Sequence, residues 1–578
     1  MNMKIRKYIA IMFLALTASY TFTACNDDET LGEAPRLFRP VASLETQSNT
    51  VVVTWDNIKG ATNYDLKLYR VTGTDKTTGE SIYEFYTEAS CESSPYTFKD
   101  LNWDEKYMVK ISCNSASKES EVYTTTDASI NYISKITSSK SIDNATRISW
   151  DEGGAIIKVI KVTTDVEGVE PRFVPVSESE YESGYVDIYD LTPETQYTFY
   201  AYSDEEIQNN DTYAGKISGK TSIAANYDEM FGAGNWIDLR NHSDEEAESY
   251  LTNSQFWKET TENMGVILKG GLDYKMSGAS FDKSITFMTG PTLESNARIV
   301  LQNAIGIGKG VTIDKIQFIN VDIYSKSAID IDENGKTFVE YNTAKGFGGL
   351  QIINVNGSGS TVNKLLFQGC RLEGYRGIVR GQADSDNFIN VTFDGCTING
   401  IGDQGVVTST NKKGDWKTVT FNNCTITNIV ILCDFRSSAS ELTIDITNCT
   451  FCYAPIETTV NANAPLFRLS KNAVKLNINK TLFGPSMASD KNAGEVVMTY
   501  TAGAKGSIFT DASAAQINVA LSFKTNFTWT AIGDKTYPID GLLELSFDEN
   551  TLWQGPEKGD YKIIGNIGES GIGASKWQ

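Results

Sequence analysis

Four short apolar runs in the second half of the chain end in a residue that could bind an anion. Arginine presents planar bidentate donors that match carboxylates and sulfates. If the runs stack in register, they form a guanidinium column that binds an acidic polysaccharide. One aligned position then reads Arg380, Thr408, Arg436 and Arg468, in the runs Gly377–Arg380, Gly405–Thr408, Cys433–Arg436 and Pro465–Arg468. The alternative is that each arginine bonds turn carbonyls or pairs with a nearby acid such as Asp434, Asp384 or Asp386.

Two aromatic residues near these runs are candidates for contact with sugar. Tyr375 and Trp416 fall on neighbouring turns of the expected repeat, where their rings would stack on sugar faces. Local packing of the two rings is the alternative.

Proton abstraction is the catalytic chemistry that these residue types permit. A general base must lie within hydrogen-bond reach of the proton that it removes. The candidate bases are Arg380, Arg436, Lys412 and Lys413. Successive repeats carry no tight carboxylate cluster, which weakens the case for an enzyme. The single histidine, His242, precedes a predicted helix and disfavours a Ser-His-Asp triad.

One acidic segment matches the opening of a calcium-binding loop. Asp330, Asp332, Asn334 and the glycine that follows fit the spacing D-x-[DN]-x-[DN]-G. The twelfth place is Tyr341 instead of glutamate, and strand-like sequence surrounds the segment. A calcium site of another kind and a polar turn between repeats are both open.

These candidates lie on a repeat that organises the chain from about residue 311 to residue 483. A short motif recurs from Phe367 at Phe393, Phe421, Ile446 and Ile478, at intervals of 26, 28, 25 and 32 residues. An earlier copy begins at Phe318. Periods of this size indicate a solenoid. The alternation of apolar and polar residues indicates strands, so we expect a parallel β-helix that holds about ten coils.

Equivalent residues of such coils stack into columns. We expect one column of cysteines and one of phenylalanines, in which the cysteines pack as small buried hydrophobes and hold no metal. The cysteines are Cys370, Cys396, Cys424 and Cys449. A bend tolerant of left-handed backbone should hold Asn320, Gly369, Gly395, Asn423 and Asn448.

Two earlier segments, 37–127 and 128–222, read as all-β modules. Each has a tryptophan on an early strand, Trp55 or Trp150, and a Leu-x5-Tyr run, which ends at Tyr107 or Tyr197. These features resemble fibronectin type III domains, where that tyrosine pins a loop to the sandwich. The resemblance implies spacer or adhesion modules. Cys91 and Cys113 could form a disulfide bond, which their spacing alone does not decide.

We assign residues 223–578 to the β-helix domain with a cap at its start. Ser243-Asp-Glu-Glu246 has the pattern of a capping box. It predicts a short helix that has Ala247, Tyr250 and Leu251 on one face and that covers the first coil.

The N-terminus reads as an export signal. Lys4, Arg6 and Lys7 precede an apolar run too short to span a membrane. The run from Phe22 to Cys25 resembles the lipobox of bacterial lipoproteins, with phenylalanine in place of the usual leucine. It implies that residues 1–24 are a signal peptide, that Cys25 is lipidated and that 25–36 is a tether. The acidic run after Cys25 resembles a surface-export signal.

The net charge of the chain bears on the class of partner that it can bind. The formal net charge of −22 disfavours nucleic acid as a general partner.

The repeats and the anchor resemble the pectate-lyase-like right-handed β-helix superfamily. They are similar to surface lipoproteins of polysaccharide-utilisation loci. This implies polysaccharide capture at the outer membrane, facing the cell exterior, with an outer-membrane glycan transporter as a possible partner. The first alternative is a polysaccharide lyase that acts on uronate-containing glycan by β-elimination, for which lyases of that superfamily use arginine or lysine as base and usually calcium. The second is a structural adhesin or complex subunit.

Overall fold

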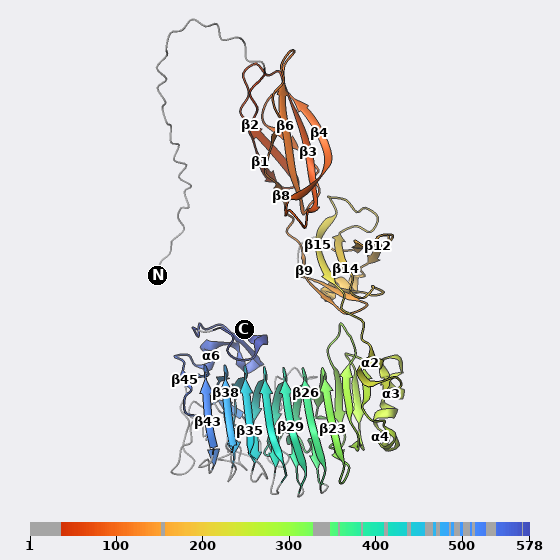
Figure 1. Cartoon of the computed structure of the whole chain (residues 1–578), viewed down its shortest axis with the longest axis vertical. Coiled ribbons are helices and arrows are strands. Elements are labelled where there is room, and N and C mark those ends of the chain that lie inside the picture. The colour runs from red at the N-terminus through yellow and green to blue at the C-terminus, as the bar shows by residue number, and fades with distance from the viewer. Residues whose placement is uncertain are drawn as a thin grey trace.

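The chain folds into two β-sandwiches followed by a long parallel β-solenoid (Figure 1). Half of the residues are in strands and 8% in helices. The computed structural model describes residues 36–151, 156–326, 347–356, 359–382, 385–409, 414–435, 441–456, 466–469, 474–484, 487–489, 498–500, 509–510, 515–526, 539–568 and 570–578. The all-β fold that the sequence predicts is confirmed.

The first sandwich packs two antiparallel sheets. One sheet has the order β1 (Ala42–Gln47), β2 (Thr50–Trp55), β5 (Tyr96–Phe98). The other has the order β4 (Ser81–Cys91), β3 (Asn63–Thr74), β6 (Glu105–Asn114), β7 (Tyr123–Thr124). Strand β8 (Ala128–Ile130) also pairs with β6, so this sandwich extends past residue 127, where the sequence suggested its end.

The second sandwich repeats this plan. Its sheets are β13 (Tyr185–Ile188), β10 (Thr146–Trp150), β9 (Ile136–Ser141) and β12 (Arg172–Pro175), β11 (Val159–Thr164), β14 (Gln196–Tyr202), β15 (Tyr213–Lys220). In the first module Tyr107 Oη accepts the Asn102 N–H at 3.0 Å. In the second, Tyr197 Oη accepts the Thr192 N–H at 2.9 Å. Both predicted tyrosine corners are therefore confirmed, and each sandwich is fibronectin type III-like.

Cys91 and Cys113 are free thiols. Strand β3 separates them, because Tyr64 is the register partner of Cys91 on one side and of Cys113 on the other. The possible disulfide bond is absent from this structure.

Three parallel sheets build the solenoid, and we call them S1, S2 and S3. S1 contains β16 (Trp236–Asp238), β17 (Met264–Leu268), β20 (Ile285–Thr289), β23 (Thr312–Ile319), β26 (Thr361–Gln368), β29 (Asn387–Asp394), β32 (Trp416–Asn422), β35 (Leu442–Thr447), β38 (Val474–Asn479) and β43 (Ala515–Ala520). S2 contains β18 (Asp273–Met276), β21 (Ala297–Leu301), β24 (Val321–Tyr324), β27 (Arg371–Tyr375), β30 (Thr397–Ile401), β33 (Thr425–Ile429), β36 (Thr450–Cys452), β39 (Leu482–Phe483), β44 (Phe523–Lys524) and β45 (Leu543–Glu544). S3 contains β25 (Gln351–Val355), β28 (Gly377–Gly381), β31 (Val407–Ser409), β34 (Cys433–Phe435), β37 (Phe467–Arg468) and β42 (Phe509–Thr510).

Columns of identical side chains fill the interior. Phe318, Phe367, Phe393 and Phe421 stack with ring centroids 5.0 to 5.2 Å apart. The cysteine column lies beside them, and each thiol donates to the carbonyl of a phenylalanine of a preceding coil, as Cys370 does to Phe318 at 3.3 Å. Burial raises the pKa of Cys370 and Cys424. The four cysteines are core residues, as the sequence predicts.

The bend between S1 and S2 needs left-handed backbone. Asn320, Asn423 and Asn448 have φ of 52°, 54° and 50° there, and Gly369 and Gly395 have φ of 62° and 63°. The predicted bend is confirmed, since glycine and asparagine tolerate this conformation best.

Helices α2 (Tyr227–Phe231), α3 (Asp244–Leu251) and α4 (Ser254–Glu259) cover the first coil. Ser243 Oγ accepts the Glu246 N–H at 3.3 Å to begin α3, whose Ala247 and Leu251 are buried. The predicted capping helix is confirmed.

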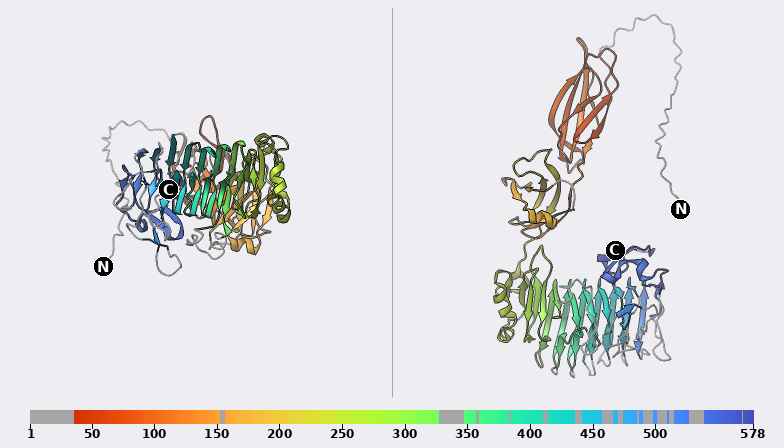
Figure 2. Two further views of the ribbon diagram at one scale, coloured as in Figure 1. Left: turned by 90° about the horizontal axis from the view of Figure 1, so that it is seen from below. Right: turned by 180° about the vertical axis from the view of Figure 1, so that it is seen from behind.

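A C-terminal segment packs on the outer face of S2 over the later coils, beside which Figure 2 shows it. It contains α6 (Glu549–Leu552), β46 (Trp553–Gly555) and β47 (Asp560–Ile563).

Polar contacts join the three modules. Between the sandwiches, Tyr213 Oη donates to Asp104 at 2.6 Å and Asp104 also accepts the Tyr132 N–H at 2.9 Å. Between the second sandwich and the solenoid, Arg147 pairs with Glu294 at 2.6 Å. Lys140 Nζ donates to the Leu293 carbonyl at 3.1 Å.

Candidate functional site: a charged strip on the solenoid

The predicted arginine column exists only in part. Along S3, the strand register aligns Asn354, Arg380, Thr408, Asp434, Arg468 and Thr510. Asp434 therefore takes the place expected for Arg436, and the prediction was wrong at that position. The cause is the strand period of two, because Cys433 and Phe435 are both apolar and either could precede the aligned residue. Cys433 does so in the structure, and Arg436 lies outside the described residues.

Asp434 changes the chemistry of this row. Its side chain is 1% exposed and pairs with Arg468 at 2.8 Å. Arg380 is half-buried on β28 between Asn354 and Thr408. The interpretation in which an arginine pairs with a nearby acid is confirmed for Arg468, so the row is not a simple anion site.

The two candidate sugar-stacking rings are core residues. Tyr375 is 0% exposed, and its Oη donates to the Tyr324 carbonyl at 2.8 Å. Trp416 is also 0% exposed, with ring centroids 4.9 Å from Phe388 and 5.3 Å from Phe435. Their predicted place on exposed turns was wrong, because both belong to strands and point into the solenoid, so local packing is what they do.

The remaining candidates are outside the described residues or buried. Cys25, Asp330, Asp332, Asn334, Asp384, Lys412 and Lys413 are outside them. Asp386 is 2% exposed. Within the described ranges, no group of three metal-binding side chains is suited to hold an ion.

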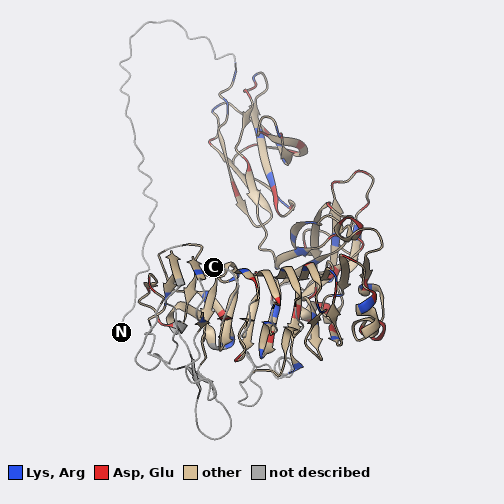
Figure 3. Ribbon diagram, turned by 60° about the horizontal axis from the view of Figure 1, so that its bottom comes forward, with Lys and Arg blue, Asp and Glu red and all other residues tan. Residues whose placement is uncertain are grey.

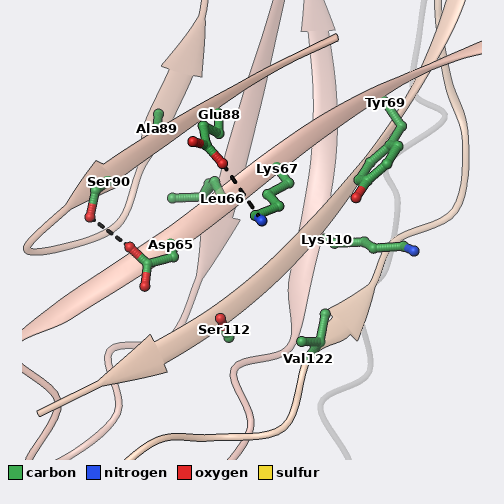
Figure 4. A pocket seen from close by; sticks show the side chains of 10 residues that line it. All are labelled: Asp65, Leu66, Lys67, Tyr69, Glu88, Ala89, Ser90, Lys110, Ser112 and Val122. Atoms are coloured by element: carbon green, nitrogen blue, oxygen red, sulfur yellow. Dashed lines mark hydrogen bonds and ion pairs between the residues drawn. The ribbon is translucent and has the colours of Figure 1, made fainter. Parts of the chain in front are cut away.

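A hollow of about 740 Å³ lies on the outer face of the β4–β3–β6–β7 sheet (Figure 4). Its polar groups already bond one another. Ser90 Oγ donates to Asp65 at 2.8 Å, and Lys67 lies 3.7 Å from Glu88. These four groups therefore satisfy one another.

S2 carries a row of alternating charges along its outer face, which we call the charged strip. It consists of Asp273, Arg298, Asp322 and Arg371, one from each of β18, β21, β24 and β27. Figure 3 shows acidic and basic positions side by side on the solenoid strands. Arg298 pairs with Asp273 at 2.6 Å. Such a row presents both signs of charge along the solenoid axis.

Arg371 lies at the end of the strip and is 41% exposed. Its Nε pairs with Glu373 at 2.6 Å, and its backbone N–H donates to Asp322 at 2.9 Å. Asp322 also accepts from Asn296 at 2.9 Å. Burial nevertheless raises the pKa of Asp322 above its usual value.

Lys576, from the C-terminal segment, extends the strip by one position. Its Nζ donates to Thr397 Oγ1 at 2.6 Å, and Thr397 is the register partner of Arg371. Lys576 is exposed, but the neighbouring groups desolvate its ammonium group, and this desolvation and the charge of Arg371 lower its pKa to about 8. Across the described part of the chain, no carboxylate forms an ion pair with this ammonium group. Two cations therefore lie one strand apart, and among the described residues only Arg371 has an acidic partner at ion-pair distance.

Sequence reasoning passed over this strip, although the repeat alignment contained two of its four residues, Asp322 and Arg371. The residue before the last apolar position of the motif reads Asp322, Arg371, Thr397, Thr425 and Thr450. That position faces outward in every coil, so its charges were a usable signal. Nothing in the repeat points to Lys576, which arrives from 179 residues away.

Comparisons with solved structures found segments of fibronectin type III domains. No family model and no curated protein matches the chain. A two-domain fibronectin type III segment of chicken tenascin is 15% identical, with 31% of this chain and 97% of that chain covered and a TM-score of 0.14. The FN1–FN3 domains of chicken CNTN1 are 14% identical, with coverages of 32% and 68% and a TM-score of 0.13. None of the described helices is long and apolar enough to cross a membrane.

Proposed function

We propose that this protein is a lipid-anchored outer-membrane protein that captures an acidic polysaccharide at the cell surface and presents it to a transporter or an enzyme. The anchor is Cys25, which the lipobox-like run before it supports. The sandwiches act as a stalk, and the charged strip is the binding face.

One observation carries the proposal: Arg371 and Lys576 lie together, and the ammonium group lacks a carboxylate partner among the described residues. A bound carboxylate or sulfate between them relieves their repulsion and gains charge-assisted hydrogen bonds. Arg298 and the acids of the strip then bond neighbouring sugars through their hydroxyl groups. Because the cations are partly exposed, binding weakens as salt concentration rises.

Affinity electrophoresis tests this proposal. The mature chain without its lipid is run through gels that contain neutral or acidic polysaccharides, with and without calcium. We expect retardation by at least one acidic polymer and weaker retardation of Arg371→Ala. The matched control is Arg376→Ala, which removes a similarly exposed arginine that follows β27 and pairs with Asp403 at 2.8 Å. Free migration through every gel would contradict the proposal and favour a structural subunit.

A second candidate, a polysaccharide lyase, rests on the pKa of Lys576. An amine with a pKa of about 8 is a competent general base near neutral pH. Arg371 would hold the uronate carboxylate while Lys576 removes the neighbouring proton, and the leaving sugar oxygen departs with a proton from water. Unsaturated products absorb ultraviolet light. Rising absorbance that Lys576→Ala abolishes while binding persists would make the protein an enzyme.

A further inference from the structure

The last residues of the chain occupy the continuation of the charged strip. We call Gly573–Gln578 the C-terminal tail. Beyond Arg371, the same outward row of S2 becomes three threonines, Thr397, Thr425 and Thr450. Each threonine hydroxyl bonds the tail. Thr450 Oγ1 accepts the Ala574 N–H at 2.9 Å, Thr425 Oγ1 accepts Trp577 Nε1–H at 2.7 Å, and Thr397 Oγ1 accepts from Lys576 Nζ at 2.6 Å.

The tail lies along the solenoid axis. It begins over the later coils, where the Gly573 N–H donates to the Lys480 carbonyl at 2.9 Å. It then passes β36 and β33 and places Lys576 over β30, beside Arg371. The tail and the charged strip therefore form one line, in which the tail covers one half.

This contact is closely fitted. Gly573 has φ of +81°, and a Cβ added there would lie 2.7 Å from Thr450 Oγ1. Ala574 is 1% exposed, and the Trp577 ring lies 5.8 Å from that of Tyr561. The tail is a packed part of the fold that excludes any other occupant from the threonine row.

We propose that the tail is the end wall of the binding face, so that the protein binds the end of an acidic polysaccharide chain and not its middle. The inference rests on the proposed function. A linear polymer that lies over the strip in the axial direction meets Lys576 after Arg371 and cannot continue over Thr397. The open strip covers four strands, about 14 Å at the usual strand spacing. It therefore accommodates a few terminal sugars, with the ammonium group of Lys576 facing the last of them.

Binding stoichiometry on chains of different length tests this inference. The probe is whichever of polygalacturonate, alginate, hyaluronan and heparin retards the protein most in the gels, divided into a short fraction and a fraction several times longer. Analytical ultracentrifugation counts the protein molecules bound per chain at saturation. We expect the same number for both fractions, because the number of ends is the same. Deletion of the tail also removes Lys576, so saturation should need a higher protein concentration, and the number bound at saturation should then rise in proportion to length.

A single substitution gives a second test if the deletion impairs folding. Gly573→Ala should lift the tail, because its Cβ meets Thr450 Oγ1 in a left-handed backbone conformation. The matched control is Gly571→Ala, at φ of +72° with no atom within 4 Å of the added Cβ. We expect length-dependent stoichiometry for Gly573→Ala and length-independent stoichiometry for the control.

The outcomes separate the two proposals. A stoichiometry that already rises with length in the intact protein would overturn the end wall but leave polysaccharide binding in place. Stoichiometry that stays independent of chain length after both tail changes would also overturn the end wall and leave polysaccharide binding in place. No binding of the intact protein to any of the four polymers would remove both proposals.

Discussion

At the residue scale, the protonation of Lys576 should set the pH range of binding. Its ammonium group is mostly charged below about pH 8 and mostly neutral above it, because its pKa is lowered to about 8. We expect affinity for the acidic polymer to fall about fivefold as pH rises through this range, equivalent to about 1 kcal/mol for one exposed ionic contact. Binding titrations from pH 6.5 to pH 9.5, with polymers that do not titrate in this range, measure this fall in affinity. Its size should correspond to the loss of roughly one charge pair.

Lys576→Arg is the control, because arginine stays protonated throughout this range. Its affinity should remain flat where that of the natural protein falls. Equal decline in both proteins would show that another group is responsible.

The pair formed by Arg468 and Asp434 should contribute to stability. Arg468→Met leaves Asp434, which is 1% exposed, without this partner. We expect a loss of about 3 kcal/mol in the free energy of unfolding, which is typical of a broken buried pair. Urea unfolding followed by circular dichroism measures the loss. Lys475→Met, which breaks an exposed pair with Glu441, should cost less than about 1 kcal/mol.

At the scale of the element, the bend between S1 and S2 needs left-handed backbone in each coil. Asparagine or glycine therefore recurs at one position, and this helped to reveal the motif in the sequence. Gly395 has φ of +63°, and a Cβ added there meets nothing closer than 3.9 Å. Gly395→Ala should therefore lose roughly 1 kcal/mol from backbone strain alone. Gly395→Asn should lose less, since three other coils place asparagine at this bend. Thermal unfolding of the two variants compares them, and equal losses would point to steric contact instead.

The same element shows how far sequence reasoning reaches. The phenylalanine and cysteine columns and the bend were predictable, because identical residues recur at fixed positions of the motif. The row on S3 was misaligned because Cys433 and Phe435 are equivalent by strand period, and only pairing with Phe467 distinguishes them. The exposure of Tyr375 and Trp416 was predicted wrongly. In each coil, interior positions and turn positions lie within a few residues of each other, so the sequence alone did not separate them. Lys576 was unpredictable, since a tertiary contact brings it to Thr397.

At the scale of the whole molecule, Asp104 should hold the two sandwiches in a fixed relation. It accepts hydrogen bonds from Tyr213 and from the Tyr132 backbone, and Tyr132 lies 5.1 Å from the Tyr213 ring. Asp104→Ala removes both bonds at the junction. We expect small-angle X-ray scattering to show a broader distribution of overall dimensions, together with a loss of roughly 1 kcal/mol in the stability of the first sandwich, because Asp104 has φ of +56°, where alanine is strained. The control is Asp127→Ala, which breaks bonds within the first sandwich. An identical scattering curve for Asp104→Ala would mean that apolar packing alone fixes the junction.

The helices over the first coil have a consequence for association between copies. The end strand of a parallel sheet presents unpaired N–H and C=O groups that another copy could extend. Helices α2 to α4 cover the coil to which β16, β17 and β18 belong, and so oppose head-to-tail growth of S1 and S2 into filaments. The covering residues therefore oppose polymerisation, and their loss would leave the end strands free to pair with another copy.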